Sequence, residues 1–155
     1  MKPRNLIRGG LAGLVGGMVF GMLMGMMGML PMVAKLVGAS SAAAGMIVHL
    51  INSSLIGAAF AVVFGSKART LSSGAILGLI YGVFWWILGG LIIMPLWLGM
   101  PVQLSVAGMK NAMPSLMGHM IYGIVTGLLY SKLAKRKPAT VTAQGKFLLK
   151  NSLSC

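Results

Sequence analysis

The chain has no aspartate and no glutamate, and its only cysteine, Cys155, is the last of its 155 residues. Carboxylates carry most proton relays, cation sites and acid–base catalysis, so their absence argues against hydrolysis by paired acids and against carboxylate-coupled cation transport. A lone cysteine forms no disulfide within the chain, and its terminal position does not match a prenylation motif. Any chemistry must rest on the histidines, the tyrosines or a cofactor, and we predict a protein without enzymatic activity of its own.

Polar helix faces are also missing. Hydrophobic residues make up 57% of the chain, its mean hydropathy is +0.92, and no apolar stripe alternates with a polar one as it would in a soluble helix. Four apolar stretches of about 20 to 24 residues are long enough to cross a hydrocarbon core of about 30 Å as helices. We therefore predict an all-α polytopic membrane protein, with a four-helix bundle in residues 1–137 and a mobile cytoplasmic tail in residues 138–155. The predicted transmembrane helices are residues 11–34, 42–65, 71–94 and 114–133.

Small residues recur every four positions in these stretches, and such ridges let helix backbones approach closely in lipid. The first and third stretches carry glycine ridges, and the second and fourth each carry a ridge of small residues centred on a histidine. This pattern predicts a glycine zipper and a tandem duplication of one helical hairpin, with both copies pointing the same way. The two glycine ridges are Gly9, Gly13, Gly17, Gly21 and Gly25, then Gly74, Gly78, Gly82 and Gly90, with Trp86 at the remaining position.

The cations predict the orientation of the chain. All lysines and arginines except Lys35 and Lys110 fall on one side of the predicted bundle. By the positive-inside bias, this side is cytoplasmic, so we predict a multi-pass protein of the inner (cytoplasmic) membrane with both termini in the cytoplasm. The first apolar run is too long for a signal peptide and lacks a cleavage site of small residues, so we predict that it is retained as a helix.

The formal net charge of +13 must be balanced from outside the chain. Anionic lipid headgroups on the cytoplasmic face are the partners that we expect, and an acidic membrane subunit would serve equally. Nucleic acid is disfavoured because the cations are spread over three membrane-adjacent segments without interleaved aromatic residues. The most compact lipid-facing basic cluster is Lys132, Lys135, Arg136 and Lys137.

The two histidines, His49 and His119, lie at matching positions of the second and fourth stretches. Each is followed three residues later by a hydrogen-bonding side chain, Asn52 and Tyr122. Helix geometry places both imidazoles about 8 to 12 Å inside the outer membrane boundary. Ionisable residues at this depth are expensive enough to be functional candidates by default.

Three interpretations of this pair stay open. Both imidazoles could be axial ligands of a b-type haem or another porphyrin in an electron-transfer protein. Alternatively, each neutral histidine forms hydrogen bonds between helices and fixes their register, and duplication alone would copy such a packing residue. In the third interpretation, the histidines join methionine thioethers in a copper pathway.

Methionines line one side of the first predicted helix. Their spacing suits a thioether ladder for Cu(I), yet methionine is also the adaptable filler beside glycine-rich surfaces. No methionine or cysteine cluster guards the predicted outer entrance, so we favour packing and predict no resident metal site. The residues of this side are Met18, Met22, Met26 and Met29.

Trp85 and Trp86 lie near the middle of the third predicted helix, away from the interface where tryptophan usually anchors. Their indole N–H groups need acceptors within the bundle or on a bound partner. They form either a bulky plug between helices or a wall for a flat cofactor or a lipid tail. Together with Asn52 and Tyr122, they are the candidate surroundings of a cofactor at His49 and His119.

The segments HLINSSLIGAAF (residues 49–60), YGVFWWILGGLIIMP (residues 81–95) and SLMGHMIYGIVTG (residues 115–127) together resemble a set of small four-helix bacterial membrane proteins. The resemblance covers roughly residues 10–133. It implies a self-contained family with a four-helix membrane fold, and it brings no activity, cofactor or site residues because that family is uncharacterised.

The favoured function is a structural or accessory bundle in a larger membrane assembly or a homo-oligomer. The first alternative is the haem protein with His49 and His119 as ligands. The second is a small-solute or copper transporter or channel, which is disfavoured because the polar lining of the spans is almost limited to residues 52–54. The apolar segment 95–113 could be re-entrant or interfacial.

Overall fold

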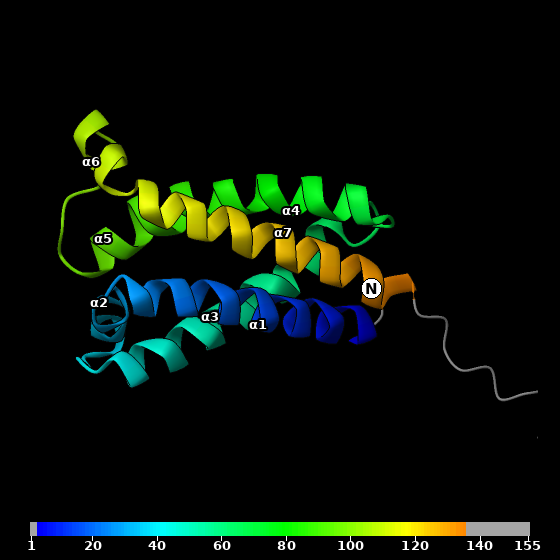
Figure 1. Ribbon diagram of the computed structural model, residues 1–155, viewed down its shortest axis with the longest axis horizontal. Helices are drawn as coiled ribbons and strands as arrows, with labels where there is room; N and C mark the ends of the chain where they lie inside the picture. Colours follow the sequence, from blue (N-terminus) through cyan, green and yellow to red (C-terminus); the bar gives the residue numbers. More distant parts are fainter. Residues whose placement is uncertain (1–2, 136–155) are drawn as a thin grey trace, which may run out of the picture.

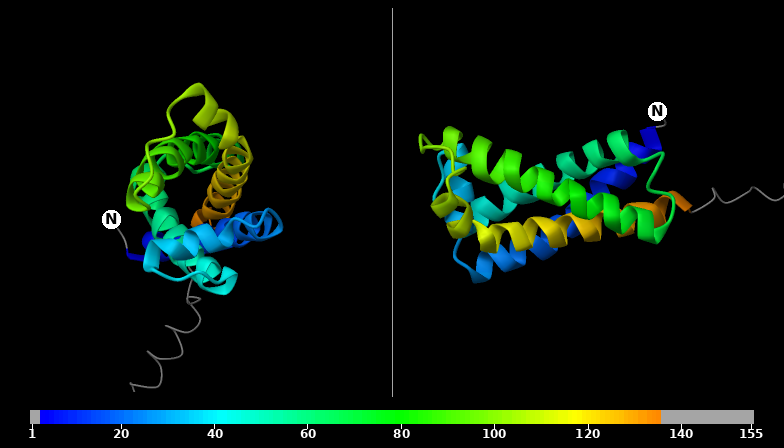
Figure 2. Two further views of the ribbon diagram at one scale, coloured as in Figure 1. Left: turned by 90° about the vertical axis from the view of Figure 1, so that its left-hand side faces the viewer. Right: turned by 90° about the horizontal axis from the view of Figure 1, so that it is seen from above.

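The computed structural model describes residues 3–135, which contain helices and no strand. Helix α1 (Pro3–Met26) packs along α3 (Ala42–Phe64), and α4 (Leu71–Trp85) packs along α7 (Met113–Lys135). Contacts between α1 and α7 join the two pairs, whereas α3 and α4 barely touch (Figures 1 and 2). The molecule is therefore an elongated bundle in which one side, between α3 and α4, is loosely closed.

Short helices cover one end of this bundle, which we call the capped end (residues 27–41 and 94–112). They are α2 (Leu30–Ala34), the 3-10 turn η1 (Lys35–Val37), α5 (Met94–Trp97) and α6 (Val106–Asn111). The start of α1 and the end of α7 lie at the opposite end (Figure 1). We call this opposite end the basic end, since it carries Arg4, Arg8, Lys67, Arg69, Lys132 and Lys135.

Three helical segments are long and apolar enough to cross a membrane, which supports the prediction of a membrane protein. They are Pro3–Met26, Ala42–Phe64 and Leu71–Trp97. The fourth predicted span, residues 114–133, coincides with α7, which is 23 residues long. Within the described residues, α7 does not reach the apolar composition of the other three, because His119, Thr126 and the lysines of its last turn lower its hydropathy.

The first predicted span was wrong as a single helix over residues 11–34. The helix begins at Pro3 and ends at Met26, and the chain then turns before α2. Gly28 adopts a φ of 68°, a left-handed conformation that glycine alone adopts at no steric cost. Pro31 follows in the first turn of α2, where a missing N–H is tolerated. Residues 27–41 consequently fold over the capped end instead of extending the span.

The third predicted span continues beyond residue 94 and changes its winding. Residues Trp86–Ile93 form a π-helical segment, η2, which joins α4 to α5. Pro95 has no backbone N–H and therefore cannot continue the hydrogen-bond pattern of η2. The N–H of Gln103 donates to the Leu91 carbonyl oxygen at 2.8 Å. This hydrogen bond holds the segment after α5 against η2, close to Pro95.

Glycines place helix backbones in direct contact within both packed pairs. A Cβ atom at Gly13 would strike the Ser53 carbonyl oxygen of α3. In the other pair, a Cβ at Gly123 of α7 would strike the Gly78 carbonyl oxygen of α4, and a Cβ at Gly127 would strike that of Gly74. Such approaches leave no room for any side chain, so these glycines determine how closely the helices pack.

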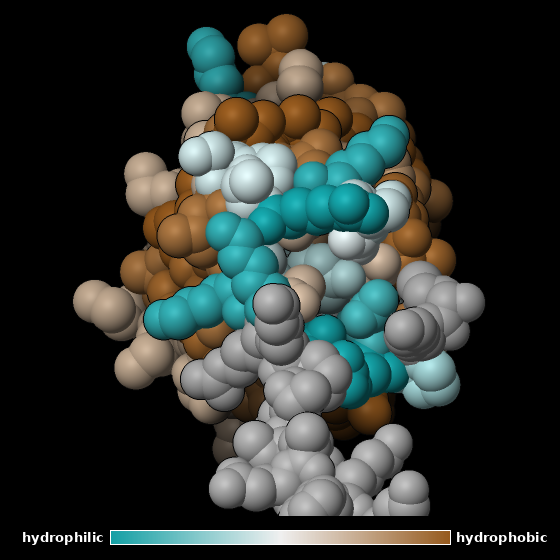
Figure 3. Space-filling view, turned by 90° about the vertical axis from the view of Figure 1, so that its right-hand side faces the viewer, coloured by the Kyte–Doolittle hydropathy of each residue, from teal (hydrophilic) through white to brown (hydrophobic). Residues whose placement is uncertain are grey.

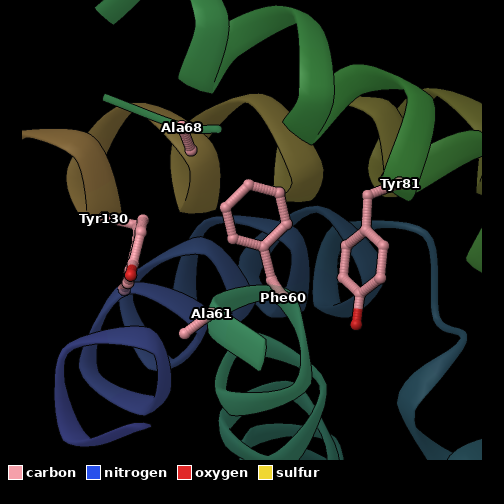
Figure 4. Close-up of a cluster of buried hydrophobic side chains, with 6 residues drawn as sticks. Phe60, Ala61, Ala68, Tyr81 and Tyr130 are labelled. Atoms are coloured by element: carbon pink, nitrogen blue, oxygen red, sulfur yellow. The ribbon is translucent and has the colours of Figure 1, made fainter. Parts of the chain in front are cut away.

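An aromatic cluster closes the bundle near the basic end (Figure 4). Phe60 of α3 lies between Tyr81 of α4 and Tyr130 of α7, with ring centroids 5.3 and 5.8 Å away. The Tyr81 hydroxyl donates to the Ile56 carbonyl at 2.8 Å, which links α4 to α3. Because α3 and α4 share few contacts beyond this region, they leave space between them toward the capped end.

Candidate ligand cavity

The space between the two helix pairs toward the capped end is a cavity of about 750 Å³. Its walls come from α1, α3, η2 and α7, and the short segments of the capped end close it from above. A volume of this size lies within the range of about 300 to 1,000 Å³ that small-molecule sites occupy. The apolar wall includes Phe20, Met24, Met29, Met32, Val33, Val48, Ile56, Ile93, Met94 and Leu98.

Polar groups are few and uncharged on the described part of this wall. None of the described lining residues is a lysine or an arginine, and the chain has no acidic residue. The cavity is therefore suited to a neutral molecule whose body is apolar and whose few polar atoms form hydrogen bonds. The polar lining residues are His49, Asn52, Ser53, Gln103, Asn111, Ser115, His119 and Tyr122.

His119 reaches the cavity from the first half of α7. Its Nδ1 donates to the Ser115 carbonyl oxygen at 2.8 Å and lies 3.3 Å from the Ser115 hydroxyl. A carbonyl can only accept, so Nδ1 carries a proton, and Nε2 of the neutral imidazole is then an acceptor or a ligand. The backbone of its own helix thus fixes the orientation of His119.

His49 is held differently, by a contact between two helices. Its Nε2 donates to the Gly17 carbonyl oxygen of α1 at 3.0 Å. The Phe20 ring contacts both imidazoles edge-on, with centroid distances of 5.2 Å to His49 and 4.9 Å to His119. The structure therefore brings the two predicted histidines to one cavity, with a phenyl ring beside both.

The other predicted site residues divide into two groups. Asn52, Tyr122 and Trp85 line the cavity, whereas Trp86 does not. Trp86 is buried, and its Nε1 donates to the Ala112 carbonyl oxygen at 3.2 Å, which ties η2 to the segment before α7. The Trp85 Nε1 is shielded from solvent and makes no hydrogen bond of normal geometry with any described residue.

Tyr122 connects the cavity wall to the neighbouring helix. Its hydroxyl donates to the Ser53 carbonyl oxygen at 2.7 Å, and its side chain is 3% exposed. The tyrosine hydroxyl is therefore engaged in holding α7 against α3. Asn52, the residue before Ser53, also lines the cavity and is exposed.

The capped end bridges the two helix pairs above the cavity. Trp97 of α5 donates its Nε1 proton to the Leu36 carbonyl oxygen of η1 at 3.2 Å. The extended chain after α5 contributes Gln103, and α6 contributes Asn111. Segment 95–113, whose placement the sequence left open, thus forms part of the lid over the cavity.

The methionines whose spacing would suit a Cu(I) ladder do not face one site. Met18, Met22 and Met26 are exposed on the outer surface of α1, at 46%, 61% and 86% of their maximum area. Met29 lines the cavity instead. Within residues 3–135, no group of three His, Cys, Asp or Glu side chains converges to hold a metal ion.

Several lining residues were missed by sequence reasoning. Phe20 is the only aromatic residue of the first apolar stretch, a signal that could have marked it. Gly90 lines the cavity beside His119, and its pairing with Gly89 ahead of Pro95 is the only local sign of the π-helical segment. Gln103 and Asn111 carried no signal, because their positions depend on how the loop folds back.

Comparison with known proteins gave no relative: no family model, no curated protein and no solved structure matches this chain.

Proposed function

We propose that the chain is a non-enzymatic, four-span membrane protein that binds one neutral, membrane-soluble molecule in the cavity between α3 and α4. The observation that carries this proposal is the uncharged cavity of about 750 Å³ onto which both histidines, Asn52 and Trp85 converge. These polar groups line the cavity from α3, α4 and α7, where a bound molecule can form hydrogen bonds with them.

The position of α7 supports a fourth span. Its polar side chains face other helices: Tyr122, Thr126 and Ser131 are all buried. The Ser131 hydroxyl lies 3.0 Å from the Ala68 carbonyl oxygen and 2.9 Å from that of Gly127, so its one proton is shared between these two acceptors. A helix whose polar groups are buried in this way can cross lipid despite a lower hydropathy. The four helices would then form two tandem hairpins associated through glycine zippers.

The distribution of charge supports the proposed orientation in the inner membrane. The basic end carries the described cations apart from Lys35 and Lys110, which belong to the capped end. By the positive-inside rule, the basic end faces the cytoplasm, and the cavity opens in the outer half of the membrane. In the predicted basic cluster, Lys132 and Lys135 end α7, while Arg136 and Lys137 lie outside the described residues, as does the tail 138–155.

The lining defines the class of ligand. An apolar body is favoured because most of the wall is hydrophobic, and a net charge is disfavoured because no counter-charge faces the cavity. A carbonyl or hydroxyl oxygen on the ligand would accept from the Asn52 amide, and a hydroxyl would in addition donate to His119 Nε2. A quinone ring offers the acceptor alone, and a long-chain alcohol offers both the acceptor and the donor.

The route of entry follows from the helix packing. Because α3 and α4 barely contact each other above the aromatic cluster, a molecule dissolved in the bilayer can reach the cavity from the side. Without acidic groups, the protein has little machinery to transform such a molecule. We therefore propose that it stores the ligand or presents it to a partner subunit or a second copy, which is a form of the predicted accessory role.

Haem is the second candidate, and His119 is the observation that favours it. An Nδ1–H bonded to a backbone carbonyl is the usual support of a histidine that ligates metal through Nε2. Ligation by both histidines would use His49 Nδ1, or Nε2 once it has left the Gly17 carbonyl, and the porphyrin would compete with Phe20 for the space beside both rings.

One experiment separates the two candidates. The protein is purified in mild detergent, its visible spectrum is recorded oxidised and reduced, and bound molecules are extracted and identified by mass spectrometry. We expect no Soret band and one neutral lipophilic molecule per chain. A Soret band that disappears in His119→Ala would establish haem instead, and a preparation that holds only charged lipids would overturn both candidates.

A further inference from the structure

A second, smaller cavity of about 330 Å³ lies at the basic end, on the far side of the aromatic cluster. The three segments that form it are separate in sequence: the first turns of α1, the loop between α3 and α4, and the last turns of α7. Figure 3 shows hydrophilic side chains gathered on this end, while the flanks of the molecule are hydrophobic. The residues of this basic cleft are Asn5, Gly65, Ala68, Arg69, Tyr130, Ala134 and Lys135.

The loop between α3 and α4 is fixed onto α7, which positions Arg69. The Ala68 side chain is fully buried, and its carbonyl oxygen accepts from the Ser131 hydroxyl at 3.0 Å. Arg69 then donates its Nε proton to the Ser66 carbonyl oxygen at 2.8 Å. This bond uses one of five guanidinium N–H donors and anchors the side chain at the wall of the cleft.

Tyr130 closes the bottom of the basic cleft. It is 0% exposed, and a Cβ atom at Gly65 would lie 2.5 Å from its hydroxyl oxygen, so only glycine at that position leaves room for the tyrosine. The cleft thus combines a hydroxyl and an amide, from Tyr130 and Asn5, with two cations, Arg69 and Lys135, from separate segments.

The cations of this cleft have no acidic side chain to balance them, because the chain contains none. Converging cations repel one another and favour an anion from outside. A planar guanidinium, an ammonium and neutral donors around one small cavity are the groups that bind a phosphate. We propose that the basic cleft binds the phosphate group of an anionic lipid headgroup or of a free phosphate.

This site differs from the basic cluster that the sequence indicates. In that cluster Lys132 and Lys135 are both exposed, but only Lys135 lines the cleft. The other cleft cation, Arg69, lies in the loop between α3 and α4, far from Lys135 in sequence. If surface cations attracted lipid only diffusely, each cation of the basic end would contribute equally to binding. The cleft predicts instead that Arg69 and Lys135 contribute more than Lys67 and Lys132.

The test is a titration of the detergent-purified, full-length protein with short-chain phosphatidylglycerol and, separately, with inorganic phosphate. Loss of both cleft cations in Arg69→Gln/Lys135→Gln should weaken binding roughly 25-fold, at about fivefold for each cation near the anion. The matched control, Lys67→Gln/Lys132→Gln, removes the same charge from the same end and should bind within about twofold of the parent, since neither lysine lines the cleft.

Two further variants guard against a folding artefact. Arg69→Lys/Lys135→Arg keeps both charges and should retain binding, and Lys135→Gln alone, at an exposed position, should weaken it about fivefold. Binding of phosphatidylglycerol without binding of inorganic phosphate identifies a lipid headgroup as the ligand, and competition by inorganic phosphate identifies the free anion. Equal weakening in the two glutamine pairs, or no binding of either anion by the parent protein, would overturn the proposal.

Discussion

Gly123→Ala is expected to destabilise the protein by on the order of 2 to 3 kcal/mol. A Cβ atom at this position would strike the Gly78 carbonyl oxygen and lie 2.9 Å from the Gly82 nitrogen. These are backbone atoms of α4, which cannot rotate away as a side chain would. The two helices must therefore move apart, and the contacts along the whole α4–α7 pair weaken.

The matched control for this variant is Gly25→Ala. A Cβ there would meet only the tip of the Leu30 side chain, at 3.5 Å, an ordinary contact. Alanine is also the better helix former by roughly 0.5 to 1 kcal/mol, so this variant should be neutral or slightly more stable. The free energy of unfolding is measured in mixed detergent micelles. Equal effects of the two substitutions would show that close backbone contact does not hold α4 and α7 together.

Gly90→Phe is expected to weaken the binding of a neutral ligand by roughly 100-fold or more, which corresponds to about 2.8 kcal/mol. A Cβ at Gly90 is tolerated, because its nearest neighbours would be Trp86, His119 and Ser115 at 3.5 to 3.9 Å. The phenyl ring beyond it occupies the cavity beside His119. The readout is quenching of tryptophan fluorescence by a short-chain alkyl benzoquinone, a flat neutral probe.

Ile80→Phe is the control for Gly90→Phe, because it adds a phenyl ring to α4 outside the cavity. Ile80 is 56% exposed on the surface of the bundle and does not line the ligand cavity. Its quinone affinity should match that of the parent protein, and both variants should unfold at similar temperatures. If the two phenylalanine variants bound the probe equally well, the quinone would be dissolving at the protein surface.

Apolar length alone predicted part of this architecture. The second span was expected over residues 42–65 and is observed at Ala42–Phe64, with Ser41 accepting from the Ala44 N–H as its cap. The predicted end of the first span was wrong because hydropathy does not detect a turn. Residues 27–34 are as apolar as the helix before them, and only Gly28 and Pro31 indicate the change of direction. Apolar length predicts that a segment is helical in lipid, and backbone conformation decides where the helix ends.

The candidate site was partly predictable for a related reason. Matching depths in two helices placed His49 and His119 near the same end, and both line one cavity. The sequence could not show that Phe20 contacts both rings or that Trp86 faces away, toward Ala112. These facts depend on the rotation of each helix about its axis, which is set by contacts between backbones. In helices that are apolar on every side, no hydrophobic stripe reveals that rotation.

The polar residues of α7 illustrate the same limit. Thr126, Tyr130 and Ser131 lower the hydropathy of the segment, so its composition argues against a span. All three side chains are buried inside the protein, so they do not face lipid. A polar residue in a membrane helix is informative only once the face that carries it is known.

The most direct measurement of the central claim is the location of a bound probe. A neutral long-chain alcohol that carries a photoreactive diazirine near its hydroxyl is incorporated into membranes containing the full-length protein, activated by light, and mapped by peptide mass spectrometry. We predict labels on the cavity-lining stretches of α3 and η2, around Asn52 and Gly90, and their loss in Gly90→Phe. Labels distributed over exposed outer residues such as Met22 and Ile80, unchanged in Gly90→Phe, would contradict ligand binding between α3 and α4.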